Sequence, residues 1–284
     1  MFPLNKDKLL LITLRLLTGV SVLSLLFILF YLFKETLPIL QSTSSLDFFT
    51  DNSWHPTSGE YLLSPMIIGS LSIMLGAMII SIPVGILAAI LSQFYAPVWF
   101  SKTLNRVVEI LSGIPSVIYG FLGIVTIVPL LAQFEAPGTS ILAGVLVLSF
   151  IVLPNIILIS GNALSQINSV YIHNAMSLGL SRYSIIRHII LPQARSGLFT
   201  GIVLQSGRAI GETLAVLMVC GNVVQIPGSI FDPVRTLTSN IALEMAYAMD
   251  DHRSALFLSG IMLMLVVLIV ILIAERLSPK ELKL

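Results

Sequence analysis

Long apolar runs, rather than alternating apolar and polar positions, dominate this sequence. The longest of them lie at residues 9–33, 66–92, 107–131, 140–160, 198–222 and 255–275. A helix of roughly 20 apolar residues spans the hydrocarbon core of a bilayer. The pattern therefore predicts an all-α, polytopic membrane protein with six transmembrane helices.

Composition supports this class and excludes several others. The chain has 284 residues, of which 56% are hydrophobic and 10% are charged, whereas a soluble chain carries about 25% charged residues. The net charge of +1 offers no basic surface to a nucleic acid. The single cysteine, Cys220, cannot form a disulfide within the chain.

Basic residues predict the orientation of the spans. Most of the 15 lysines and arginines fall in the two terminal segments and in the two loops on the same side. Positive residues favour the cytoplasmic side, so we expect both termini to lie in the cytoplasm. The residues on this side are Lys6, Lys8, Arg15, Lys102, Arg106, Arg182, Arg187, Arg195, Arg276, Lys280 and Lys283.

The spans divide the chain into three parts. Residues 1–65 contain an anchor helix, which we interpret as retained because no small-residue cleavage site follows it, and the first outer loop. Residues 66–275 form a core of five spans with a cytoplasmic loop at 161–197. Residues 276–284 form a cytoplasmic tail.

Several kinds of chemistry are missing from the sequence. No lysine follows a glycine, so the Gly-Lys-Ser/Thr phosphate loop of an ATPase is absent. The histidines are not at metal-ligand spacing, and there is no Gly-x-Ser-x-Gly nucleophile motif. We therefore predict no catalytic residue, metal or cofactor, and no enzymatic activity in this chain.

The cytoplasmic loop predicts two short amphipathic helices over 169–192. Ala175, Met176 and Leu178 would form one apolar face, and Gly179 would end the first helix. Ser181 would cap the second helix, and Pro192 would stop it. Such a pair fits either a lipid surface or a groove on a partner protein.

The fifth span carries two charges inside an apolar stretch. Arg208 and Glu212 are four residues apart, which places them on one face of a continuous helix. They would form either a structural ion pair or part of a water-accessible path, in which a guanidinium suits an oxyanion such as phosphate. The neighbouring polar residues Gln205, Ser206 and Thr213 would line the same path.

The third span contains helix breakers. Gly113 and Pro115 interrupt the apolar stretch just before Ser116. A half-helix that begins there would direct its positive end at an anion. The alternative is a packing kink.

The cytoplasmic loop also resembles a family signature. Gly179, nine further residues and then Ile189-x-Leu191-Pro192 are similar to the loop of importer permeases in ABC (ATP-binding cassette) transporters. The family loop begins Glu-Ala-Ala, where this chain has His173, Asn174 and Ala175. The resemblance implies a MetI-like permease fold and a loop that docks on a separate ATPase.

Further motifs resemble the permeases of the bacterial phosphate importer. They are GIPSVIYG at 113–120 and GRAIGET at 207–213. Phe48-Phe49, Trp54-x-Pro56, Pro65, Gly221-Asn222 and Leu237-Thr238-x-x-Ile241-Ala242-x-Glu244 favour the PstC-type subunit over its PstA-type partner. The resemblance implies a protein of the bacterial inner membrane, in a heterodimer with a PstA-type permease, two ATP-binding subunits and an external phosphate-binding protein. An importer for tungstate, molybdate or sulfate, and a carrier that works alone, are the alternatives.

Overall fold

The computed structural model describes residues 4–277 except 43, 45 and 52. The predicted tail beyond Leu277 lies outside the described residues. Regular structure in the described part is almost entirely helical, which confirms the predicted fold class. Four helices are long and apolar enough to cross a membrane, namely α1 (Leu4–Ser42), α3 (Ser64–Ile90), α7 (Ile141–Ser165) and α13 (Asp250–Leu277).

Two of the predicted spans are broken helices. In the third, α4 (Val98–Ser112) meets the helical segment Ser116–Leu131 at an angle of 93°. That segment contains α5 (Ser116–Leu122) and α6 (Val128–Leu131). In the fifth, α10 (Leu191–Gly211) ends before α11 (Leu214–Val219) begins. The described residues thus contain four potential spans, or five if the bent pair is one span.

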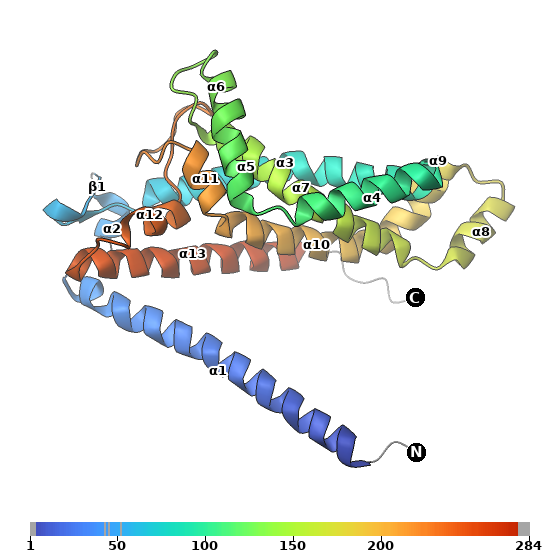
Figure 1. Cartoon of the computed structure of the whole chain (residues 1–284), viewed down its shortest axis with the longest axis horizontal. Coiled ribbons are helices and arrows are strands. Elements are labelled where there is room, and N and C mark those ends of the chain that lie inside the picture. The colour runs from blue at the N-terminus through green and yellow to red at the C-terminus, as the bar shows by residue number, and fades with distance from the viewer. Residues whose placement is uncertain (1–3, 43, 45, 52, 278–284) are drawn as a thin grey trace.

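Short elements occupy the two ends of the helix bundle (Figure 1). At one end lie α12 (Leu237–Glu244), α2 (Asp47–Thr50) and an antiparallel hairpin of β1 (Trp54–His55) and β2 (Glu60–Tyr61), joined by a 3₁₀ turn. At the other end lie α8 (Ser169–Ser177) and α9 (Arg182–Ile185), and both α1 and α13 run from the hairpin end toward that side.

Close backbone packing holds the bundle together. The helices α3 and α7 run side by side, and α10 crosses α7 so closely that a Cβ on Gly201 would lie 2.2 Å from Cγ2 of Ile159. One turn away, a Cβ on Gly197 would lie 3.0 Å from Cβ of Ala163. Small residues permit this approach, which favours association of helices in lipid, where there is little hydrophobic driving force.

Three π-helical turns each precede a proline. They are Leu91–Tyr95 before Pro97, Gly123–Ile127 before Pro129, and Ile186–Ile190 before Pro192. At Pro129 and Pro192 the π turn accommodates a proline inside a helix, where the proline lacks an N–H group and crowds the carbonyl four residues earlier, whereas Ala96 is extended before Pro97. The prediction that Pro192 stops the helix is therefore wrong, because the helix continues through the π turn into α10.

Candidate functional site

The break in the fifth span lies at Glu212. The backbone of Glu212 is extended, with φ −68° and ψ 123°, directly after α10 ends at Gly211. The Thr213 hydroxyl donates to the Gly211 carbonyl at 3.1 Å, and the Thr238 hydroxyl donates to the Glu212 carbonyl at 3.2 Å. These bonds satisfy carbonyls that the interrupted helix releases.

This break changes the relation between Arg208 and Glu212. Glu212 is the C-cap of α10, so the continuous helix expected through this pair ends at Gly211. Arg208 is exposed and Glu212 is half-buried, and the ion pairs found among the described residues do not include one between them. The structural ion pair is therefore not formed, and the guanidinium of Arg208 faces outward from this chain.

Gln205 and Ser206 lie on the buried side of α10. Ser206 donates to the Ile202 carbonyl at 2.9 Å, whereas the buried Oε1 of Gln205 has no hydrogen-bond partner among the described residues. The Gly201–Ile159 contact sets the antiparallel register of α10 against α7, which places Gln205 level with Asn155. The side-chain Nδ2 of Asn155 is buried and likewise unpartnered. An unmatched acceptor and an unmatched donor therefore occupy the same level of this helix pair.

The breakers of the third span produce a sharp bend. Pro115 is the N-cap of α5, which begins at Ser116, so the predicted half-helix is confirmed. A bend of 93° is far larger than a packing kink. The helix α5 packs against α11, where a Cβ on Gly120 would lie 2.7 Å from Cα of Ala215. The two broken spans are therefore neighbours.

The loop at 161–197 forms the predicted helix, glycine turn and helix. Gly179 has φ +78°, a left-handed conformation that suits glycine. The Ser181 hydroxyl accepts from the Ser184 N–H at 3.3 Å and caps α9. Ile186 and Ile190 are buried against the end of the bundle. Part of this loop is therefore fixed to its own chain.

The predicted apolar face on α8 is divided between interior and surface. Ala175 is 3% exposed, but Met176 is 51% and Leu178 is 81% exposed. His173 and Asn174 are also exposed. Of the residues in the family signature, Ile189, Leu191 and Pro192 are half-buried where α9 leads into α10. The loop therefore presents large apolar side chains that its own chain does not cover.

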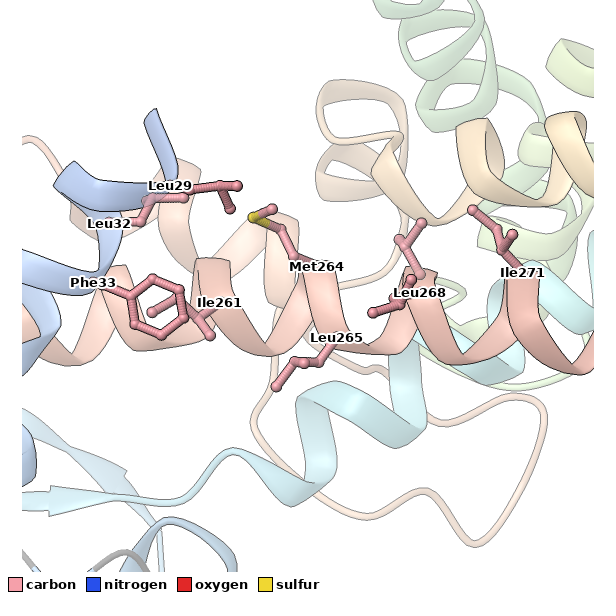
Figure 2. Close-up of a pocket in the computed structure, with 9 residues that line it drawn as sticks. Leu29, Leu32, Phe33, Ile261, Met264, Leu265, Leu268 and Ile271 are labelled. Carbon is pink, nitrogen blue, oxygen red and sulfur yellow. The ribbon is translucent and has the colours of Figure 1, made fainter. Parts of the chain in front are cut away.

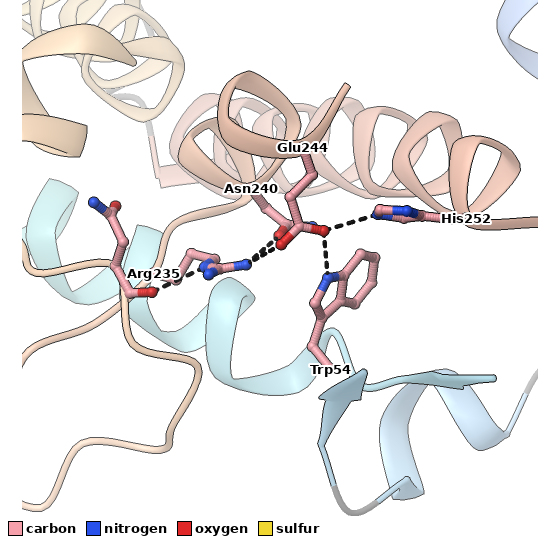
Figure 3. Close-up of polar contacts among 6 residues, drawn as sticks. Trp54, Arg235, Asn240, Glu244 and His252 are labelled. Atoms are coloured by element: carbon pink, nitrogen blue, oxygen red, sulfur yellow. Dashed lines mark hydrogen bonds and ion pairs between the residues drawn. The ribbon is translucent and has the colours of Figure 1, made fainter. Parts of the chain in front are cut away.

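A polar cluster at the hairpin end centres on Glu244, which sequence analysis placed in a family motif without a structural role. The Glu244 carboxylate accepts a hydrogen bond from Arg235 at 2.5 Å and one from the Trp54 indole at 2.8 Å, and it lies 2.8 Å from Nε2 of His252 (Figure 3). Arg235 also donates to the side chain of Asn240 at 3.0 Å. We call these five residues the Glu244 cluster. It joins the hairpin, α12, α13 and the segment before α12.

The surroundings of Glu244 favour its charged form. Burial alone would raise the pKa of this carboxyl, but the hydrogen bonds from Trp54, His252 and Arg235, with the charge of Arg235, hold the pKa below its ordinary value. The cluster is thus a buried ion pair whose acceptors are occupied. Trp54 lies 190 residues before Glu244, a distance at which sequence pattern carries no contact information.

A different cavity, between α1 and α13, offers no chemistry for an anion. Its volume is about 520 Å³ and its walls are apolar, formed by Leu29, Leu32, Phe33, Ile261, Met264, Leu265, Val267, Leu268 and Ile271 (Figure 2). No residue in the most apolar 18-residue window of α1 is buried, and Figure 1 shows α1 diverging from the bundle. The cavity is an open apolar groove.

Proteins and a protein family that are already known match the sequence of this chain. Residues 81–283 match the family model described as "Binding-protein-dependent transport system inner membrane component". The chain is 38% identical over 249 residues to the probable ABC transporter permease protein YqgH of Bacillus subtilis, covering 86% of this chain and 81% of the relative. It is 33% identical over 261 residues to the phosphate transport system permease protein PstC of Xylella fastidiosa, covering 83% and 81%.

Solved structures share the fold. A bacterial ABC transporter that imports the polysaccharide alginate matches with a TM-score of 0.62 at 15% identity, over 95% of this chain and 96% of that one. The MetNI methionine ABC transporter matches with a TM-score of 0.56 at 18% identity, over 76% and 92%. The chain therefore belongs to the family of binding-protein-dependent transport system inner membrane components. It is a membrane-spanning permease subunit of an ABC importer, with PstC-type permeases among its homologues.

Proposed function

We propose that this permease forms part of the path for inorganic phosphate in an ATP-driven importer. The observation that carries the proposal is Arg208, an exposed guanidinium one turn before the break at Glu212. A guanidinium offers paired N–H donors that match two oxygens of an oxyanion. The carboxylate of Glu212 would keep the anion from binding too tightly to be released. The 33% identity to a permease named for phosphate transport supports the choice of substrate.

Groups around the two broken spans would complete the path. Gln205, Ser206 and Thr213 would contribute from α10 and the break, and Gly113, Pro115 and Ser116 from the bend before α5. The packing of α5 against α11 supports this assignment, because it holds the two broken spans beside each other. Irregular backbone is tolerated at membrane depth where it lines a water-filled cavity or is buried in protein.

The cytoplasmic loop would dock on a separate ATP-binding subunit. Leu178 and Met176 are exposed beside the signature positions His173, Asn174 and Gly179, as expected for a surface that a partner covers. The whole importer would contain a PstA-type second permease, two ATP-binding subunits and an external phosphate-binding protein. Both termini would lie in the cytoplasm with this loop.

A substrate panel tests the proposed function. The complex is purified from its native membrane and reconstituted in liposomes with the binding protein for each anion. We expect ATP-dependent uptake of phosphate and little uptake of sulfate, molybdate or tungstate. Preferential uptake of another oxyanion would exclude the phosphate assignment. Phosphate flux by this chain without an ATPase would favour the stand-alone carrier.

The docking role of the loop is tested separately. The substitution Leu178→Ser removes an exposed apolar side chain at the loop, and Leu46→Ser removes one that is 71% exposed near the hairpin end. We expect only Leu178→Ser to reduce the amount of ATPase subunit that copurifies. A normal complex with normal coupling in this variant would favour the lipid-surface alternative.

A further inference from the structure

The short helix α12 is held at both of its ends. At its C-terminal end, Glu244 belongs to the cluster with Trp54, Arg235 and His252. At its N-terminal end, the main-chain N–H of Leu237 donates to the Ser70 hydroxyl at 3.0 Å. Because α12 is bonded to a different neighbour at each end, a movement of one neighbour can shift the helix against the other.

The N-terminal end of α12 also contacts the break in the fifth span. The Thr238 hydroxyl donates to the main-chain carbonyl of Glu212 at 3.2 Å. Thr238 is 6% exposed, so water does not readily replace this bond. A carbonyl at a helix break has no partner within its own helix, and the Thr238 hydroxyl supplies one.

The helix α12 is short, and its side chains are well packed. Leu237, Ser239 and Asn240 have no exposed surface. The Thr236 hydroxyl caps the helix by accepting from the Ser239 N–H at 3.2 Å. The eight residues of α12 span about 12 Å at the rise of an α-helix. Burial and capping make this segment move as one body rather than bend.

We propose that α12 positions the break at Glu212, with Thr238 and Glu244 as positioning residues for the anion path. The Glu244 cluster fixes one end of α12 to Trp54 of the hairpin, and the Thr238 hydroxyl fixes the other end to the Glu212 carbonyl. A movement of the hairpin therefore changes the backbone next to Arg208. The effect on anion transport rests on the proposed function, whereas the mechanical link rests on the contacts alone.

Hydrogen exchange in the intact complex tests the mechanical link. The change Trp54→Phe removes the indole donor from Glu244 but keeps an aromatic ring in place. If α12 transmits the change, the amides of residues 209–216 exchange about fivefold faster than in the wild type, as expected for the loss of one hydrogen bond. The change Thr238→Val removes the hydrogen bond to the Glu212 carbonyl itself and therefore speeds exchange of the same amides. Thr238→Ser, which retains the hydroxyl, leaves them at the wild-type rate.

The contrary result is equally specific. If Trp54→Phe leaves the amides at 209–216 within about twofold of the wild type, the Glu244 cluster does not act on the break and the proposal is overturned. Unchanged exchange in Thr238→Val overturns it as well. These measurements need no transported anion, so their outcome is independent of the substrate assignment.

Transport kinetics then test the positioning role. With wild-type complex that takes up phosphate, we expect Thr238→Val to raise the half-saturating phosphate concentration and Thr238→Ser to restore it. Wild-type kinetics in Thr238→Val would show that the hydroxyl does not position the path. If the wild type does not transport phosphate, the proposed function fails, while hydrogen exchange still decides the role of α12.

Discussion

Replacement of Glu244 by glutamine should loosen the hairpin end of the molecule. The carboxylate accepts from Arg235 and from Trp54. If the amide oxygen of a glutamine accepts from Arg235, its NH₂ group meets the indole N–H of Trp54, and two donors then face each other. A hydrogen bond to a charged group contributes about 1.5–3 kcal/mol. We therefore expect Glu244→Gln to destabilise this end by about 2 kcal/mol.

The single cysteine provides the assay. Cys220 is 1% exposed, and its carbonyl accepts from the Val234 N–H at 2.9 Å. The adjacent Asn222 carbonyl accepts from Arg235 at 3.0 Å. When the destabilised cluster opens, Arg235 leaves the Asn222 carbonyl, and the chain beside Cys220, whose thiol packs against Gly144, loosens. A loss of about 2 kcal/mol corresponds to an increase of roughly 30-fold in maleimide labelling of the purified chain.

A matched control separates this effect from the loss of any carboxylate. Glu35 lies 3.7 Å from Arg253 in a partly exposed ion pair, and such pairs contribute about 0–1 kcal/mol. We expect maleimide to label Cys220 in the Glu35→Gln variant at close to the wild-type rate. If Glu244→Gln also labels at that rate, the cluster does not stabilise this end, and the reasoning is refuted.

Three further predictions concern pH, helix packing and the loop at 161–197. Because the pKa of Glu244 is lowered on folding, its stabilising contribution is complete above the ordinary pKa of about 4.3 and is lost as the pH falls through the lowered value. Acid should therefore reduce the unfolding temperature of the wild type more steeply than that of Glu244→Gln. Gly201→Val should prevent stable insertion, since a Cβ there would lie 2.2 Å from Ile159, whereas Gly207→Ala, with its nearest contact at 4.0 Å, should be tolerated. Gly179→Ala, at φ +78°, should cost about 1–2 kcal/mol and reduce coupled ATPase activity without reducing insertion.

Each of these predictions has a clear contrary outcome. If the unfolding temperatures of wild type and Glu244→Gln fall in parallel as the pH is lowered, protonation of Glu244 is not linked to unfolding. Equal membrane yields of Gly201→Val and Gly207→Ala would contradict the close approach of α10 and α7. Undiminished coupling in Gly179→Ala would show that the left-handed turn is not needed for the loop to act.

Local signals predicted the parts of the fold that depend on neighbouring residues. The long apolar runs, the half-helix after Pro115 and the cap at Ser181 all follow from short-range chemistry, and the structure contains them. Pro192 was misread because a proline ends a regular α-helix but is accommodated after a π turn. The expected fifth span assumed a continuous helix, whereas the structure has a break after Glu212, whose carbonyl accepts from Thr238.

The rest of the site depends on contacts across long stretches of chain. Glu244 belongs to a family motif in the sequence, but its contacts appear only when the fold brings Trp54 and His252 to it. The unpartnered amides of Asn155 and Gln205 are likewise visible only once α7 and α10 are placed in register. Hydropathy contains no information about such pairings, because each residue alone is compatible with many partners.

Phosphate uptake by an Arg208→Gln complex tests the central claim most directly. Arg208→Lys is the matched variant, because it keeps the charge but loses the paired donors of the guanidinium. With copurification showing that both variants assemble, we predict no ATP-dependent uptake of labelled phosphate by Arg208→Gln and partial uptake by Arg208→Lys. Wild-type uptake by Arg208→Gln would contradict the assignment of Arg208 to the anion path.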